Sequence, residues 1–235
     1  MLASMTQEDA SPSYPHTFDL EGILRRSVEL DLAAMGLLRP ESYAIDQLAL
    51  DTMFSYSACE VALEHARAIR TLISEGFDTS AASLLRLQFE AQVRSIWLVW
   101  AASEKELEAI DADPTTQTEA AANKILPGVA VMVKALKDTG PPGCFEMLDG
   151  FRTMIVPTLN AFVHSGFHPL KQHTRGYPEK LMIRVLKDSN AIFCMTAMQL
   201  AALTGDAEII VPMTKIQPGF ADCLPPLILR QSSLA

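Results

Sequence analysis

The chain has 235 residues, of which 49% are hydrophobic and 20% charged, and its formal net charge is −9. This acidic balance argues against a general basic groove for nucleic acid, whose affinity comes mainly from Lys and Arg on phosphates, but it leaves room for a local basic site. No apolar run reaches the ~20 residues that span a bilayer. The first residues lack the basic start and apolar block of a secretory signal, so we expect a cytoplasmic protein with no membrane partner.

Helical signals recur along the chain, whereas the alternation typical of strands is almost absent. Helices are expected, in chain order, over residues 18–35, 43–75, 80–102, 104–112, 117–137, 145–164 and 178–203. Thr17 or Asp19 caps the first helix, and Gly36 ends it. Ser103, with Glu106 three residues later, predicts a capping box at the start of the fourth.

Prolines and glycines predict where the later helices break. Pro127-Gly128 predicts a kink or break in the fifth helix, and Pro157 can split the sixth. Residues 139–143 form the clearest loop. We therefore expect an all-α helical bundle of about six to eight helices. The predicted organisation is a flexible tail over 1–16, a bundle domain over 17–205 and a C-terminal segment over 206–235 that packs on the bundle.

The first polar cluster lies in an apolar helical stretch and comprises Arg86, Glu90, Arg94 and Trp97. Their spacing of four, four and three places them on one helical stripe. Glu90 lies one turn from each arginine. The stripe is either a structural ion-pair ladder, or one arginine presents a free guanidinium to a cleft and binds an anion such as a phosphate.

The second polar cluster comprises Asn160, His164 and His168, with Gly166 ending the helix and His168-Pro169 following in a turn. Asn160 and His164 are four apart and face the same way, so Asn160 could orient the imidazole. Histidine is the natural general acid or base near neutral pH. The alternative is that His164 only caps its helix.

At these two clusters the chain resembles bacterial helical families related to the HEPN superfamily. The resemblance covers roughly residues 80–170. It is carried by Leu84-Leu85-Arg86-Leu87-Gln88-Phe89-Glu90 with Arg94 and Trp97, and by Leu159-Asn160-Ala161-Phe162-Val163-His164-Ser165-Gly166 with His168-Pro169-Leu170. It implies a helical bundle, a homodimer, and metal-independent ribonuclease activity in a defence or toxin-antitoxin system. RNA or a nucleotide and a cognate antitoxin-type protein would be the partners.

The sequence departs from that family at one position, because Leu159 stands where the family's arginine would hold the scissile phosphate. Under the ribonuclease hypothesis His164 is the acid or base, Asn160 orients it, and Arg86 or Arg94 supplies the missing charge. Glu90, Trp97 and His168 complete the site. The alternative hypothesis is a catalytically inactive module that binds a partner protein, nucleotide or small anion.

A metal site is a third hypothesis. The four cysteines are widely spaced: Cys59, Cys144, Cys194 and Cys223. Zinc would need closely spaced pairs, so we expect buried, reduced thiols and no cofactor. A carboxylate-bridged site would draw on Glu60, Glu64, Glu90, His164 or His168. Four-helix metal proteins usually carry Glu-x-x-His pairs, and the sequence has none.

Overall fold

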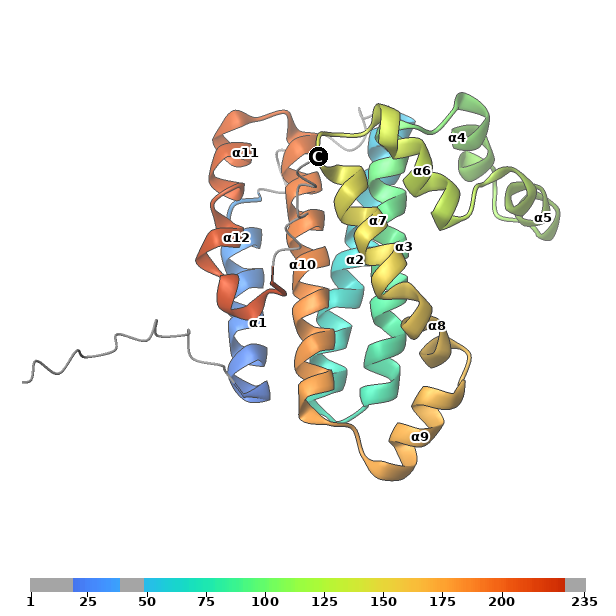
Figure 1. Cartoon of the computed structure of the whole chain (residues 1–235). Helices are drawn as coiled ribbons and strands as arrows, with labels where there is room; N and C mark the ends of the chain where they lie inside the picture. Colours follow the sequence, from blue (N-terminus) through green and yellow to red (C-terminus); the bar gives the residue numbers. More distant parts are fainter. Residues whose placement is uncertain (1–18, 39–48, 227–235) are drawn as a thin grey trace, which may run out of the picture.

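The computed structural model describes residues 19–38 and 49–226 (Figure 1). Within these ranges the chain is helical and contains no strand, which confirms the expected all-α class. The elements are α1 (Leu20–Met35), α2 (Leu50–Ser74), α3 (Asp78–Trp100), α4 (Glu104–Asp111), α5 (Thr116–Ile125), α6 (Val129–Thr139), α7 (Cys144–Met154), α8 (Val156–Val163), α9 (Phe167–Arg175), α10 (Glu179–Thr204), α11 (Ala207–Met213), α12 (Ile216–Gly219) and the 3₁₀ helix η3 (Ala221–Cys223).

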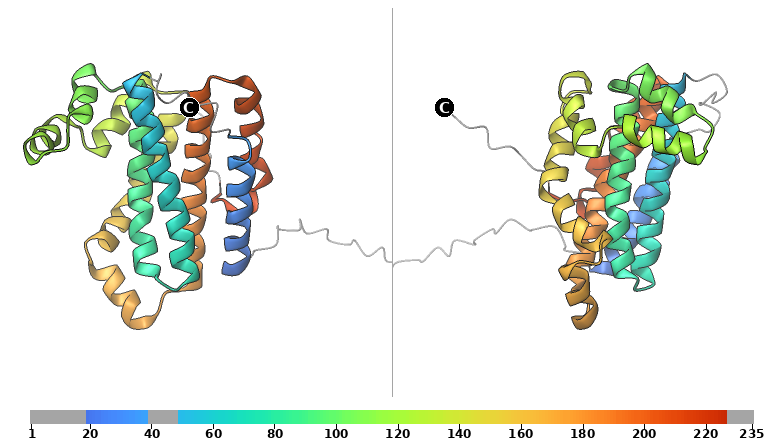
Figure 2. Two further views of the ribbon diagram at one scale, coloured as in Figure 1. Left: turned by 180° about the vertical axis from the view of Figure 1, so that it is seen from behind. Right: turned by 90° about the vertical axis from the view of Figure 1, so that its right-hand side faces the viewer.

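Three long helices, α2, α3 and α10, form the centre of the bundle. Helix α1 packs on α10 at one side, and α6, α7 and α8 cover α3 at the other (Figures 1 and 2). Large apolar side chains fill the centre, and Leu63, Phe89, Trp97 and Phe193 are each at most 2% exposed. Burial of these side chains supplies the main driving force for folding.

Buried amide and hydroxyl groups fix how α3 lies against α10. Gln88 Nε2 donates to the Ser189 carbonyl at 3.0 Å, and Ser189 Oγ donates back to Gln88 Oε1 at 2.7 Å. One turn further on, Thr196 Oγ1 donates to Gln92 Oε1 at 2.6 Å. Among the described side chains, Gln92 Nε2 is the buried polar atom without a partner. Because unpaired buried groups are costly, these bonds favour one register of the two helices.

Several sequence signals act where they were expected. The Asp19 side chain caps α1 by accepting from the Gly22 N–H at 2.8 Å. The capping box of Ser103 and Glu106 opens α4. Helix α10 ends at Gly205, whose φ of +65° suits glycine. These signals depend on residues within one turn, so they can be read from the sequence.

The described chain has more helices than the six to eight expected, because two predicted helices are each divided and because α9, α11 and α12 lie where no helix was predicted. The predicted helix over 117–137 is broken at Pro127-Gly128 into α5 and α6. The predicted helix over 145–164 is broken at Ile155 into α7 and α8, and Pro157 lies in the first turn of α8. Both breaks follow from the clash of a proline ring with the preceding turn.

The predicted turn at His168-Pro169 is wrong, since both residues lie in the first turn of α9. Proline is tolerated there because a first-turn N–H has no helical acceptor in any case. Helix α3 also begins at Asp78, slightly before the expected Thr79 or Ser80. The predicted tail over 1–16, the predicted start of the second helix and residues 227–235 lie outside the described residues.

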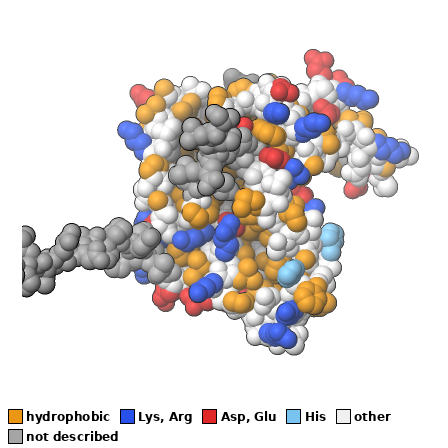
Figure 3. All heavy atoms as spheres, in the orientation of Figure 1, with side chains coloured by type: hydrophobic (Ala, Val, Ile, Leu, Met, Phe, Trp, Pro, Cys, Tyr) orange, Lys and Arg blue, Asp and Glu red, His pale blue; other side chains and the backbone are white. Residues whose placement is uncertain are grey.

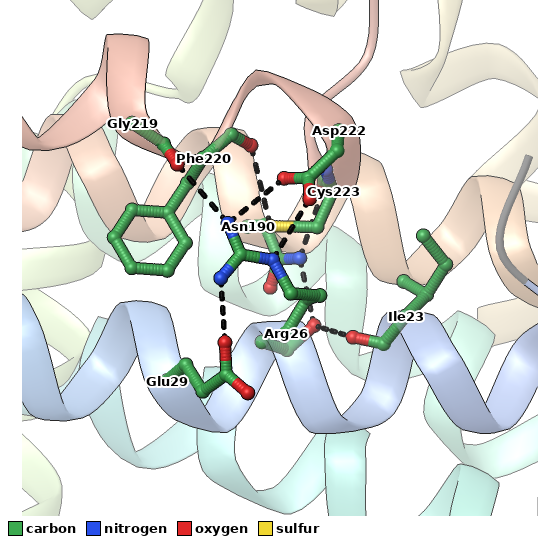
Figure 4. A network of polar contacts seen from close by, with 9 residues as sticks. Ile23, Arg26, Glu29, Asn190, Gly219, Phe220, Asp222 and Cys223 are labelled. Carbon is green, nitrogen blue, oxygen red and sulfur yellow. Dashed lines mark hydrogen bonds and ion pairs between the residues drawn. The ribbon is translucent and has the colours of Figure 1, made fainter. Parts of the chain in front are cut away.

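The described part of the C-terminal segment packs on the bundle through α11 on α10, and Arg26 of α1 holds its last part (Figure 4). Arg26 Nε donates to Asp222 Oδ2 at 2.8 Å, and Arg26 Nη2 donates to the Gly219 carbonyl at 3.0 Å. The guanidinium carbon lies 4.4 Å from the centre of the Phe220 ring. Asn190 of α10 donates to the Cys223 carbonyl at 2.9 Å. We call these contacts the C-terminal clasp.

Candidate functional site

The first polar cluster divides within α3. Arg86 Nε donates to Glu90 Oε1 at 2.7 Å, and the two side chains are 26% and 31% exposed. Glu90 therefore serves Arg86 and not Arg94. Such a partly exposed i,i+4 pair contributes only about 0.3–0.5 kcal/mol, so it is a local feature of the helix. The Arg86 guanidinium therefore already has a carboxylate partner within α3.

Arg94 has a different environment. It is half-buried, and within the described part of the chain it makes no hydrogen bond or ion pair. Burial lowers the pKa of its guanidinium below the ordinary value, and the charge of Glu90 opposes that shift. The side chain lines a groove of about 420 Å³ bordered by α2, α3, α4 and α5. Trp97, expected to bind a ligand, instead lies in the core at 2% exposure.

The second polar cluster lies at the end of α8, on the solvent side. Helix α8 packs on α3 through Leu159 and Phe162, which are 3% and 5% exposed. Asn160 and His164 point away from that contact and are exposed. Their side chains are not hydrogen-bonded to each other, and the link between them is the His164 N–H to the Asn160 carbonyl at 3.2 Å. Burial of Leu159 also means that position 159 faces the core and not the exposed polar cluster.

A strained turn follows His164. Ser165 has a φ of +50° and is the non-glycine residue with positive φ in the described ranges. The Gly166 N–H closes the turn by donating to the Ala161 carbonyl at 2.7 Å. A left-handed conformation costs roughly 1–2 kcal/mol for most residues, and such strain occurs often at functional sites. The turn sets the exposed end of α8 beside α9.

His168 stands in this neighbouring helix. It is exposed and lies edge-on to the Phe167 ring, with centroids 5.8 Å apart. Phe167 is 71% exposed, and Lys171 Nζ lies 5.4 Å from its ring centre. An open aromatic face beside a cation is a surface on which a planar base can stack.

The two polar clusters are not joined by any side-chain hydrogen bond or ion pair in the described ranges, although α3 and α8 pack on each other. No hydrogen bond or ion pair connects Arg86, Glu90 or Arg94 with Asn160, His164 or His168. Arg94 instead borders the groove near α4 and α5, at the opposite end of the bundle from α9 (Figure 1). The groove lined by Arg94 and the second polar cluster are therefore two separate candidate sites.

The basic character of residues 151–187 escaped the sequence analysis, although a local charge count would have found it. The segment contains six Lys or Arg residues, three of the five histidines and one acidic residue, Glu179. Glu179 accepts a hydrogen bond from the Leu20 N–H at 3.0 Å. Four cations have no carboxylate partner among the described residues: Lys171, Arg175, Lys180 and Lys187. Lys, Arg and His side chains gather over the lower part of the face in Figure 3, around α9. We call residues 151–187 the basic segment.

The structure offers little for metal or thiol chemistry. In residues 19–38 and 49–226 there is no group of three or more His, Cys, Asp or Glu placed to hold a metal ion. Cys59, Cys144 and Cys223 are buried, Cys194 is half-buried, and all four are free. Burial raises the pKa of Cys59 to about 12 and that of Cys144 to about 11, so these thiols stay protonated at neutral pH.

The family model of DUF6988, described as a family of unknown function, matches residues 59–226. The chain belongs to DUF6988. The matched DUF6988 region begins within α2 and takes in both polar clusters, the basic segment and Asp222 of the C-terminal clasp, whereas α1 lies before it. No curated protein and no solved structure matches the chain. Among the described helices, none has the length and apolar content to cross a membrane.

Proposed function

We propose that this protein is a HEPN-like RNA-directed protein whose basic segment holds the RNA backbone and whose His164 acts on it. The observation that carries the proposal is the basic segment itself, a concentration of cations and histidines within a chain of net charge −9. Lys and Arg side chains that neutralise phosphates supply most of the affinity of an RNA-binding surface. Phe167 offers a ring for base stacking beside these cations.

The proposed reaction is a metal-independent transesterification. His164 removes the proton from a ribose 2′-hydroxyl, and the 2′-oxygen forms a bond to the adjacent phosphorus. The bond from phosphorus to the 5′-oxygen breaks, the 5′-oxygen takes a proton from water, and the protonated His164 returns its proton to solvent, giving a 2′,3′-cyclic phosphate and a 5′-hydroxyl. Because Leu159 is buried, the charge on the phosphate is offset by Lys171 or Arg175 of α9. Asn160, one turn from His164, donates its amide to the phosphate or ribose.

The same proposal includes a homodimer and a role in defence or in a toxin-antitoxin system, with an antitoxin-type partner. It predicts that expression of the protein slows bacterial growth and that the His164→Ala variant does not. The alternative is a module that binds RNA without cleaving it. Two features favour this alternative. Arg86 is already paired with Glu90, and a buried leucine stands at position 159, where the ribonuclease family would have an arginine.

Cleavage and binding of a labelled single-stranded RNA separate these candidates. We expect His164→Ala to lower the rate of cleavage by about 100-fold or more, because a general acid or base typically contributes at least that factor to the rate. Its melting temperature should hold, because His164 is exposed. The double variant Lys171→Ala/Arg175→Ala should bind more weakly and reduce the slope of log affinity against log salt by about 1.4.

The matched control is Lys105→Ala/Lys134→Ala, which removes two exposed lysines from α4 and α6. It should leave both cleavage and the salt slope near wild type. Binding without cleavage by the wild type would select the inactive module. Equal cleavage by His164→Ala would overturn the catalytic assignment, and absence of RNA binding would overturn the whole proposal.

A further inference from the structure

Arg94 is unusual among the arginines of the described chain. Each of the others either has a carboxylate partner or is exposed, as Arg25 and Arg175 are. Arg94 is half-buried and has no such partner in the described ranges. The charge of Glu90 one turn away acts on Arg94 without bonding to it, and a half-buried charge without a bonded counter-charge is costly, so a ligand that supplies one would explain this position.

The groove that Arg94 lines has the size and character of a small-molecule site. Its volume of about 420 Å³ falls within the range of ligand pockets. Its walls are mostly apolar and come from separate helices, with Phe54 and Val61 of α2, Leu98 of α3 and Ile110 of α4. The apolar walls beside Arg94 strengthen its attraction to an anion, because water screens that attraction less there than on the flat surface of the protein.

The arm formed by α4 and α5 leaves this groove open. Neither helix contains a fully buried residue, and each is held by its own capping box, at Ser103 and at Thr115. The arm projects from the side of the bundle (Figures 1 and 2). Leu107 and Ile110 of α4 pack against the core but are only partly buried, so the apolar sides of the arm can border a groove instead of closing it.

The charges restrict the ligand to one anionic group. Glu119 also lines the groove and is exposed, so a second anionic group would meet a like charge. A guanidinium matches a carboxylate through two parallel hydrogen bonds. From this juxtaposition of one unpaired arginine and an apolar groove, we propose that the protein binds an organic acid there, with its carboxylate on Arg94 and its apolar body along α2 and α4. This goes beyond the RNA proposal and concerns the opposite end of the bundle.

Titration calorimetry of the full chain with decanoate tests the site. Decanoate is expected to bind at one site per chain. Decanol keeps the apolar body and acetate keeps the carboxylate, and each should bind at least about 10-fold more weakly. Arg94→Met should weaken decanoate binding by about 10- to 100-fold, the effect of losing hydrogen bonds to a charged group. The matched control Arg25→Met removes an exposed arginine of α1 and should leave it unchanged.

A second variant tests the site independently if Arg94→Met does not fold. Ala122 lies on α5 and lines the groove, and α5 has no fully buried residue, so Ala122→Trp should block decanoate while keeping the wild-type melting temperature. Equal affinity of Arg94→Met and the wild type would overturn the proposal, as would absence of decanoate binding to the wild type. A dimer that dissociates on Arg94→Met would assign the groove to a second copy and would also overturn it. RNA binding should be unaffected by these variants, so the two proposals can fail separately.

Discussion

At the scale of single residues, the buried and half-buried charges differ in whether another side chain pairs with them. Asp31 is 8% exposed and is held by Arg67 of α2, whose Nε and Nη2 donate to its two oxygens at 3.1 Å each. Arg70 forms a further ion pair with the same carboxylate. Arg94 has no equivalent partner in the described ranges. Removing one partner of a buried pair destabilises the fold, because the other charge is left unpaired, whereas Arg94 is the position at which we propose that a ligand supplies the counter-charge.

The Asp31 pairing predicts a pH dependence of stability. Burial by itself would raise the pKa of Asp31, but the hydrogen bonds and charges of Arg67 and Arg70 outweigh it and lower that pKa. The stabilisation is therefore fully present above the unfolded value of about 3.9 and is lost as pH falls through the lower folded value. We expect Asp31→Asn to cost about 1–3 kcal/mol at pH 7 and to flatten the decline in unfolding free energy below about pH 4.

Urea unfolding from pH 7 to pH 3 measures this effect. The control is Asp149→Asn, because Asp149 pairs with Arg152 within one helix and is about one-third exposed. That variant should stay within about 0.5 kcal/mol of the wild type. Identical acid slopes for the wild type and Asp31→Asn would show that the Asp31 pairing does not contribute.

The two buried glutamines of α3 should respond differently to replacement. Gln88→Met removes both hydrogen bonds with Ser189 and should cost about 1–3 kcal/mol. Gln92→Met removes one bond and also an unpaired buried amide nitrogen, and Thr196 keeps its bond to the Ile192 carbonyl. Its cost should be below about 1 kcal/mol. Chemical denaturation of both variants checks the ranking, and a larger loss in Gln92→Met would contradict it.

At the scale of elements, short segments are held by specific polar contacts where apolar burial is small. The 3₁₀ helix η3 spans three residues, and α12 has four residues with none buried. The C-terminal clasp holds them through Arg26, whose side chain is 21% exposed and is therefore well shielded. This explains how a segment with several prolines keeps a defined place on α1.

Removal of the clasp predicts local rather than global loosening. Arg26→Met should lower the free energy of unfolding by about 1–3 kcal/mol, since it breaks charge-assisted bonds to Asp222 and the Gly219 carbonyl. Amide hydrogen exchange should rise first in residues 206–226. Arg152→Met, whose partner Asp149 lies in the same helix, is the control and should leave that exchange unchanged. Unchanged exchange in Arg26→Met would show that apolar packing alone holds the segment.

At the scale of the whole molecule, charge is distributed unevenly. The basic segment lies around α8, α9 and the start of α10, whereas the groove lined by Arg94 lies beside α4 and α5. The net charge of −9 conceals this arrangement, because it sums regions that the fold keeps apart. An acidic chain can therefore still present a local surface to a polyanion, through short-range contacts that salt screens only beyond about 8–10 Å.

The sequence by itself determined the helical class, most helix ends and the breaks at Pro127-Gly128 and before Pro157, because caps and prolines act within one turn. It did not determine α9, where a first-turn proline was mistaken for a breaker. Only the tertiary structure decided that Glu90 pairs with Arg86, that Trp97 lies in the core and that Arg94 borders a groove. Burial and pairing depend on helices that are distant in sequence, and no local pattern records which of them meet.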